Sequence, residues 1–261
     1  MSNTFNPPPF LLNIAQRIWF VWCIVAFLLT GIISGCLYIL IFNLYNEKKA
    51  NEMTFLVTKY WGKSLLALMM VKVEKFGLDS LSLDDNAYVL VSNHLSMCDI
   101  PICMATTPIA FSFLAKKEVD RIPIVGYLCR NMHVYVDRKN KEARKETVQA
   151  MQNHIEKNRS ILIYPEGTRN KTSAALKRFY DGAFSLAIDT GRPILPITII
   201  GSNKITNPKE PYKASPAHVK CVWSSPIATQ GLAKEDINYL KGKVQQIMTF
   251  QLNEHQEEQL A

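Results

Sequence analysis

The stretch Tyr88-Val89-Leu90-Val91-Ser92-Asn93-His94-Leu95-Ser96-Met97-Cys98-Asp99 decides the fold that this chain is predicted to adopt. Its apolar first half is typical of a buried strand, and the strand ends almost directly in a histidine. Pro101 disfavours helix at the residue before it but is accepted in a first helical turn, so Asp99 is expected near the start of a helix. In one continuous helix His94 and Asp99 would lie on different faces, so they can meet only if His94 lies in the intervening loop. Strand, loop and helix would then bring a carboxylate to an imidazole, and histidine suits general-base chemistry near neutral pH.

A second polar cluster, Tyr164-Pro165-Glu166-Gly167-Thr168-Arg169, follows another apolar run, Ile161-Leu162-Ile163. The proline ends the strand, and the glycine permits the backbone to approach a ligand. Arg169 is then available for bidentate phosphate binding, while Glu166 could position a substrate amine, the arginine or a hydroxyl. Taken by itself, this hexamer would be interpreted as a surface turn. The His94–Asp99 pair, taken by itself, would be interpreted as a structural hydrogen bond. Together they predict a base with its partner at one strand end and an anion-binding group at another.

The chain from residue 77 to residue 261 is predicted to form one α/β domain that carries both clusters. Strand-like runs lie at 87–92, 111–115, 132–136, 160–164, 194–200 and 218–223. Helical patterns lie at 139–157, at 181–190 before Gly191, and at about 234–252. Strands alternating with helices indicate a layered α/β fold, with a largely parallel or mixed central sheet flanked by helices.

The N-terminal region contains a long apolar segment, residues 18–42, that carries no charge. As a helix it would be about 38 Å long, enough to cross a hydrocarbon core of about 30 Å with tilt. Gly31 and Gly35 leave open a bend that returns the segment to the same leaflet, and a buried soluble helix is the lesser alternative. The sequence before Cys36 resembles a lipoprotein cleavage box, but the apolar run continues beyond it. We therefore expect a retained membrane anchor.

Residues 51–76 have an apolar stripe with lysines between, which predicts an amphipathic helix lying along the membrane or covering the core. The anchor region is accordingly expected to comprise residues 1–76. More positive charge follows the apolar segment than precedes it, which places residues 45–261 on the cytoplasmic side of the membrane. The charges compared are Lys48, Lys49, Lys59 and Lys63 against Arg17.

The composition indicates which classes of molecule the chain is expected to bind. The formal net charge of +8 favours acidic partners such as nucleic acid, an anionic membrane surface or phosphorylated substrates. The basic segment 138–159 is more simply a solvated or lipid-facing helix face, so nucleic acid is not expected. The six cysteines include no C-x-x-C pair, which favours free thiols in a reducing compartment. The histidines beyond His94 are isolated in sequence, so no metal site is expected.

The order NH-LSMC-D followed by YPEGTRN resembles the 1-acylglycerol-3-phosphate acyltransferase family, which carries NH-x4-D and FPEGTR-type motifs at about this separation. The resemblance covers roughly residues 70–230. It includes the segments 113–118, 122–126, 134–138, 182–184 and 192–197. Two positions depart from the family pattern: Asn131-Met132 stands where a glycine is frequent, and Tyr180 replaces a common lysine. Both bear on the identity of the acceptor.

The resemblance implies His94 as general base and Asp99 as its partner in an acyltransferase catalytic domain. The acyl group would pass from a thioester of coenzyme A or acyl carrier protein to the sn-2 hydroxyl of lysophosphatidate, a membrane lipid, giving phosphatidic acid without a further cofactor. Substrate binding would fall to Glu166, Gly167, Thr168 and Arg169, with Lys116 or Lys117 as a further phosphate contact.

Other functions stay open at this point. The acceptor could be another lyso-lipid or glycerol-3-phosphate, and Cys98 could carry the acyl group covalently, although a buried structural cysteine is favoured. A basic membrane-associated binding protein would need neither His94 nor Arg169.

Overall fold

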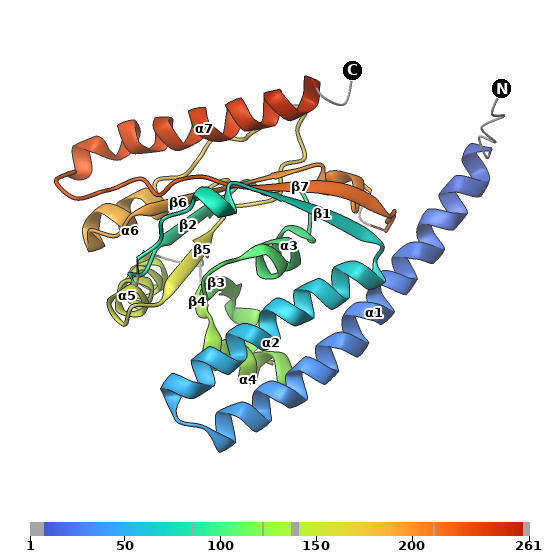
Figure 1. Ribbon diagram of the computed structural model, residues 1–261, viewed down its shortest axis with the longest axis horizontal. Helices are drawn as coiled ribbons and strands as arrows, with labels where there is room; N and C mark the ends of the chain where they lie inside the picture. Colours follow the sequence, from blue (N-terminus) through green and yellow to red (C-terminus); the bar gives the residue numbers. More distant parts are fainter. Residues whose placement is uncertain (1–7, 85, 122, 137–140, 211, 258–261) are drawn as a thin grey trace.

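The computed structural model describes residues 8–84, 86–121, 123–136, 141–210 and 212–257, and it has a seven-stranded sheet at its centre (Figure 1). The strand order is β1-β7-β6-β2-β5-β3-β4. The strands are β1 (Val71–Phe76), β2 (Val89–Ser92), β3 (Phe111–Lys116), β4 (Val134–Val136), β5 (Ser160–Ile163), β6 (Ile194–Ile200) and β7 (Ala217–Trp223).

The sheet is mixed, which confirms the predicted fold class. Strands β6, β2, β5, β3 and β4 run parallel, whereas β7 pairs antiparallel with β6 and parallel with β1. The central strands β2, β5 and β6 are buried along their whole length, as their continuous apolar sequences require when both faces are covered. Because parallel strands end at the same edge, the loops after β2, β5, β3 and β6 gather at one edge of the sheet, where ligands bind in open α/β sheets.

Helices cover both faces of the sheet in three layers (Figure 1). The α-helices are α1 (Pro9–Leu44), α2 (Glu47–Leu68), α3 (Asp99–Thr106), α4 (Pro123–Met132), α5 (Lys141–Glu156), α6 (Gly182–Thr190) and α7 (Ile237–Glu257), and the 3-10 turns are η1 (Leu78–Ser80), η2 (Lys117–Arg121), η3 (Ser202–Lys204) and η4 (Lys234–Asp236). Alternate strand residues divide between two cores: Leu90 faces the cluster of α2 and α3, whereas Val89 and Val91 face that of α5, α6 and α7.

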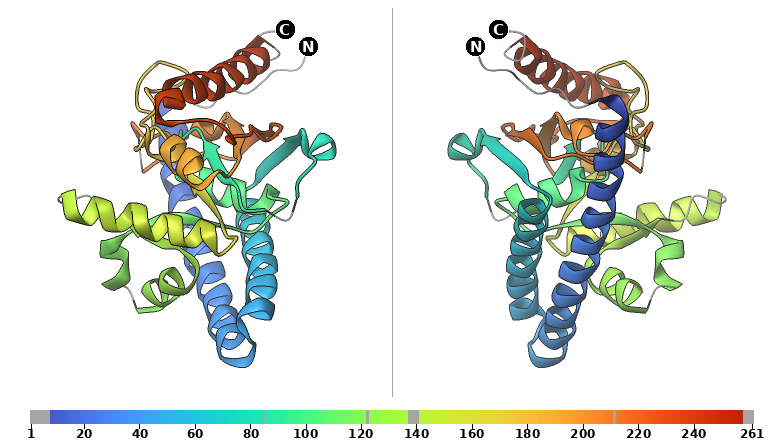
Figure 2. Two further views of the ribbon diagram at one scale, coloured as in Figure 1. Left: turned by 90° about the vertical axis from the view of Figure 1, so that its left-hand side faces the viewer. Right: turned by 90° about the vertical axis from the view of Figure 1, so that its right-hand side faces the viewer.

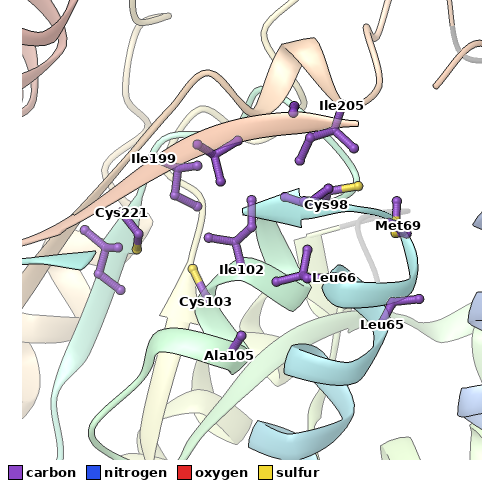
Figure 3. Close-up of a cluster of buried hydrophobic side chains, with 14 of the residues drawn as sticks. Leu65, Leu66, Met69, Cys98, Ile102, Cys103, Ala105, Ile199, Ile205 and Cys221 are labelled. Atoms are coloured by element: carbon purple, nitrogen blue, oxygen red, sulfur yellow. The ribbon is translucent and has the colours of Figure 1, made fainter. Parts of the chain in front are cut away.

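The α2–α3 layer packs tightly against the sheet. Figure 3 shows side chains of α2, including Leu65 and Leu66, gathered with Ile102 of α3 and Ile199 of β6. Gly62 of α2 permits the close approach of α2 to α3, because a Cβ at that position would lie 2.9 Å from the backbone oxygen of Pro101. The packing fixes where α3 begins, and Asp99 is its first residue.

The N-terminal helices α1 and α2 form an antiparallel pair whose connecting turn lies at the opposite end of the molecule from α7 (Figure 2). Helix α1 runs through Gly31 without a break and is longer than the expected 18–42. It is the one described helix that is long and apolar enough to cross a membrane. Side-chain hydrogen bonds join the pair, among them Tyr38 Oη to Thr58 Oγ1 at 2.8 Å and Trp22 Nε1 to the Leu68 carbonyl at 2.9 Å.

The predicted helix at 51–76 is wrong over its last turns. Helix α2 ends at Leu68, the chain reverses at Met70 with a φ of 50°, and β1 follows. The sequence Val71-Lys72-Val73-Glu74 alternates apolar and charged residues, as a strand with one face covered requires, and β7 supplies the backbone partners. The sheet therefore begins before the expected boundary at residue 77.

One other boundary differs from the sequence-based expectation. Helix α4 was not predicted, and it occupies the first residue of the expected strand 132–136. Residues 139 and 140 of the expected helix 139–157 lie outside the described residues, as do Asp137 and Arg138.

Candidate active site

The predicted histidine–aspartate pair is present at the carboxyl edge of the sheet. His94 lies in the loop after β2, and its Nδ1 is 2.7 Å from Oδ2 of Asp99, the first residue of α3. The same oxygen accepts hydrogen bonds from the backbone N–H groups of Leu95 and Ser96, at 2.7 and 2.8 Å. Oδ1 accepts from the Ser202 hydroxyl at 2.5 Å. Four donors thus satisfy a carboxylate that is 0% exposed.

The imidazole is held in one orientation with one nitrogen accessible. Because the Asp99 carboxylate accepts from Nδ1, the neutral ring carries its proton there and Nε2 has a lone pair. The ring stacks on Tyr164, with centroids 4.1 Å apart and planes 19° from parallel. The His94 side chain is 17% exposed, and no hydrogen bond to Nε2 is present within the described residues. The geometry is that of a general base open to a substrate proton.

The loop that carries His94 is fixed from behind by Asn93. Its buried side-chain amide donates to the Ile199 carbonyl and accepts from the Ile199 N–H, both at 2.8 Å. The side chain therefore replaces a backbone pairing with β6 just after β2 ends. This anchor stabilises the point at which the chain turns toward the base.

Glu166 joins the loops after β2 and β5. Its Oε1 accepts from the His94 N–H at 2.8 Å, and its Oε2 accepts from the Lys177 N–H at 3.0 Å. The carboxylate is 1% exposed, and burial raises its pKa although these two N–H groups oppose the shift. Within the described residues it makes no ion pair with Arg169. In this structure Glu166 contacts the backbone that positions the base.

The turn after Glu166 presents the remaining residues of the second cluster. Gly167 has a φ of 70°, a left-handed conformation that favours glycine, and a Cβ there would lie 3.0 Å from the Tyr180 ring. The Thr168 hydroxyl accepts from Lys177 Nζ at 2.7 Å. Arg169 is half-buried, and the described part of the chain gives its guanidinium no hydrogen bond or ion pair.

The two predicted lysines lie at the same sheet edge but farther away. Lys116 ends β3, and Lys117 begins η2; both are exposed. Strand β5 separates β3 from β2, so about 10 Å separates Lys116 from the line of β2 at the usual strand spacing. The lysine side chain must extend toward β2, or the phosphate of a substrate must lie between them, for Lys116 to act at the site.

Three interactions in the site were not predicted from the sequence. Ser202 reaches Asp99, the Thr206 hydroxyl lies 2.5 Å from that of Ser96, and Tyr164 stacks on His94. One signal was present, because Ser202 and Thr206 follow a buried strand whose carboxyl end shares an edge with β2. The sequence alone does not show which of the polar residues after β6 point toward the His94 loop.

Two alternatives lose support. Cys98 is buried, and burial raises the pKa of its thiol to about 12, which leaves too little thiolate for nucleophilic attack near neutral pH. Among the described residues, no group of His, Cys, Asp and Glu side chains could hold a metal ion.

The Acyltransferase family model matches residues 72–200. The chain is 33% identical over 183 residues to the 1-acyl-sn-glycerol-3-phosphate acyltransferase of Helicobacter pylori, an alignment that covers 69% of this chain and 74% of that protein. It is 30% identical over 210 residues to the chloroplastic 1-acyl-sn-glycerol-3-phosphate acyltransferase BAT2 of Brassica napus, which covers 78% of this chain but only 59% of that relative.

A solved structure is similar over nearly the whole length. The crystal structure of the 1-acyl-sn-glycerophosphate acyltransferase PlsC from Thermotoga maritima superimposes with a TM-score of 0.78, covering 94% of this chain and 96% of that chain. At 20% sequence identity this similarity shows the fold.

Proposed function

Because the chain belongs to the 1-acyl-sn-glycerol-3-phosphate acyltransferase family, we propose that it transfers an acyl group from a thioester to the sn-2 hydroxyl of 1-acyl-glycerol-3-phosphate. The products are phosphatidic acid and the free thiol of the carrier. The observation that carries this proposal is the His94 imidazole, with Nδ1 held 2.7 Å from Asp99 and Nε2 open to a substrate. The family resemblance noted in the sequence is confirmed by these relatives.

In the proposed reaction, Nε2 of His94 removes the proton from the sn-2 hydroxyl as its oxygen attacks the thioester carbonyl. Asp99 stabilises the imidazolium that forms and keeps the ring oriented. The tetrahedral oxyanion then collapses, the carbon–sulfur bond breaks, and the imidazolium returns its proton to the departing thiolate. General-base help of this kind contributes about 10²–10⁴-fold.

The acceptor phosphate is assigned to Arg169, with Lys116 or Lys117 as a further contact. Arg169 follows the Glu166–Gly167 turn directly, and its half-buried guanidinium suits bidentate binding of a phosphate. Glu166 is assigned a positioning role, since both of its oxygens accept backbone N–H groups. A held phosphate would keep the sn-2 hydroxyl, rather than water, beside the base.

The pair of helices α1 and α2 is proposed as the membrane anchor. Helix α1 exposes large apolar side chains along its length, including Phe10, Ile18, Ile33 and Leu44, as a lipid environment requires. Both the acceptor and the product are lipids, so an anchored enzyme meets its substrate in the membrane plane. We place the catalytic domain on the cytoplasmic side from the excess of lysines after the apolar segment, and we place the domain boundary between α2 and β1.

The test uses the full chain in membranes, supplied with a panel of lyso-lipids and glycerol-3-phosphate and with matched acyl-coenzyme A and acyl carrier protein donors. Mass spectrometry of the product is expected to show phosphatidic acid from lysophosphatidate. The variant His94→Ala should stay in the membrane but lose activity about 10²–10⁴-fold. His218→Ala, an exposed histidine on β7, is the matched control and should keep full activity. Acylation of a different acceptor, or full activity in His94→Ala, would refute the proposal.

A further inference from the structure

A second basic site lies beside the base, on the side of β6. A cavity of about 380 Å³ borders Leu95, the residue after His94. Its walls come from residues 170–175, from the turn after β6, from residues 207–209 and from Leu252 of α7. The polar lining consists of three lysines, three asparagines, a threonine and a serine: Lys171, Lys204, Lys209, Asn170, Asn203, Asn207, Thr172 and Ser173.

Every charged side chain that the described residues contribute to this cavity is a lysine. No described acidic side chain is part of its lining. The lysines come from three separate segments, and within the described chain no ion pair involves Lys171 or Lys209. Like charges brought together in a hollow without carboxylates focus a positive potential there. Ammonium groups with side-chain amides between them suit the oxygens of a phosphate ester.

The cavity adjoins the segment that carries Arg169, because the next two residues, Asn170 and Lys171, are part of its lining. The Asn170 N–H donates to the His94 carbonyl at 2.7 Å, so the chain after β5 crosses the His94 loop at this point. Arg169 comes just before the crossing, whereas Lys171 comes just after it and faces residues 200–209. Lys171 therefore lies on the segment that contacts the His94 loop, two residues after Arg169.

The proposed reaction brings two phosphate-bearing substrates to one base. In lysophosphatidate the phosphorus is only four bonds from the reacting oxygen, which fits a single cation close to the base such as Arg169. In the donor the phosphate lies at the far end of the pantetheine arm, whether the carrier is coenzyme A or a protein. The cavity is bordered by Leu95, the residue after His94, and by Lys209 and Leu252, so a donor whose phosphate end lies in it would be next to the loop that carries the base.

We infer that the cavity lined by Lys171, Lys204 and Lys209 binds the phosphate end of the acyl thioester donor, an assignment that rests on the proposed acyl transfer. The lysines take no part in the bond changes. They hold the donor so that its thioester carbonyl meets the acceptor oxygen at His94.

The test compares an acyl-coenzyme A with the matching acyl-pantetheine, which lacks both the phosphates and the adenosine, and uses the matching acyl-4′-phosphopantetheine as the donor that keeps one phosphate without the adenosine. In the variant Lys171→Gln/Lys204→Gln/Lys209→Gln, the KM for acyl-coenzyme A should rise about tenfold or more, since hydrogen bonds to charged groups are lost. The KM for acyl-pantetheine and that for lysophosphatidate should change less than about twofold. Each single variant should show a smaller rise of the same kind, which keeps the test usable if the triple variant folds poorly. Lys243→Gln, an exposed lysine on α7 outside the cavity, is the control.

Three results would overturn the inference. If the triple variant loses activity equally with acyl-coenzyme A and acyl-pantetheine and its KM for lysophosphatidate rises, the cavity binds the acceptor phosphate instead. A loss with an acyl carrier protein donor alone would make it a docking surface for that protein. Unchanged kinetics with every donor would leave the cavity without a role in donor binding.

A second measurement does not need activity. Free coenzyme A should protect Lys171, Lys204 and Lys209 of the wild-type chain from an amine-reactive label, read by mass spectrometry, but should not protect Lys243. If the wild-type chain fails to acylate lysophosphatidate, the proposed function fails, whereas this labelling still decides whether the cavity binds the donor. Equal labelling with and without coenzyme A would refute the assignment.

Discussion

Replacing Asp99 with asparagine is expected to remove one negative charge while keeping the local geometry. Oδ2 accepts three N–H groups, whereas Oδ1 accepts only the Ser202 hydroxyl. The asparagine carbonyl can take the place of Oδ2, and its NH2 group can face Ser202, whose hydroxyl can rotate and accept. The Nδ1–H of His94 keeps its acceptor, so the effect isolates the charge.

The size of the loss follows from Coulomb attraction. The imidazolium formed during catalysis and the Asp99 carboxylate would have charge centres about 4 Å apart, and at an effective dielectric constant near 20 they attract by about 4 kcal/mol. Each 1.36 kcal/mol is tenfold in rate, so kcat should fall by up to about 10³-fold. We expect kcat to fall by about 10²–10³-fold. The fall can be smaller than the upper limit because, in the variant, the dipoles of the Leu95 and Ser96 N–H groups no longer face a full negative charge.

The assay is steady-state acyl transfer to lysophosphatidate by purified, folded protein, with kcat and KM determined separately. The KM for lysophosphatidate should stay within about threefold, since Asp99 contacts no substrate in the proposed mechanism. Asp189→Asn is the matched control, because Asp189 is an exposed acid that also accepts a serine hydroxyl, that of Ser185, at 3.1 Å. A kcat within threefold of wild type in a folded Asp99→Asn variant would refute the charge argument.

Three further predictions concern stability, measured by urea unfolding in detergent. Asn93→Ala leaves the Ile199 N–H and carbonyl buried without partners and should lower the free energy of unfolding by about 2–4 kcal/mol; a loss under 1 kcal/mol would contradict this. Because burial raises the pKa of Glu166 above its ordinary value of 4.5, the stability of wild type should fall as pH rises through the raised pKa, and Glu166→Gln should remove that slope. Gly167→Ala should cost about 1–2 kcal/mol for its left-handed backbone plus a contact with the Tyr180 ring. Adding Tyr180→Ala should restore only the contact, so full recovery in the double variant would argue against backbone strain.

The sequence predicted much of the sheet, because its central strands are continuous apolar runs. Val89, Ile161 and Ile194 belong to strands that are buried on both faces, and such apolar runs can be recognised without knowing which strands pair with them. Strand β1 was mistaken for helix because it lies at the sheet edge and half of its residues are charged. Helix α4 was missed because it spans only ten residues. Marginal local patterns of this kind are decided by tertiary packing.

Part of the candidate site could also be predicted from the sequence, and part could not. The pairing of His94 with Asp99 could be predicted, since both lie within one strand–loop–helix unit and Pro101 locates the helix start. Glu166 was identified, but the expectation that it contacts substrate stays a prediction, because both oxygens of its carboxylate accept backbone N–H groups. The placement of Arg169, Lys116 and Lys117 against a substrate also stays a prediction.

By itself the sequence determined the chemistry available at each strand end: an imidazole and a carboxylate after β2, and a glutamate, a glycine and an arginine after β5. It did so because short-range spacing and strand termini are properties of neighbouring residues. Only the tertiary structure decided that Ser202 would bind Asp99 and that three lysines would line one cavity beside Leu95. Ser202 and Asp99 are 103 residues apart in the sequence, and a contact over that distance depends on which strands lie side by side in the sheet.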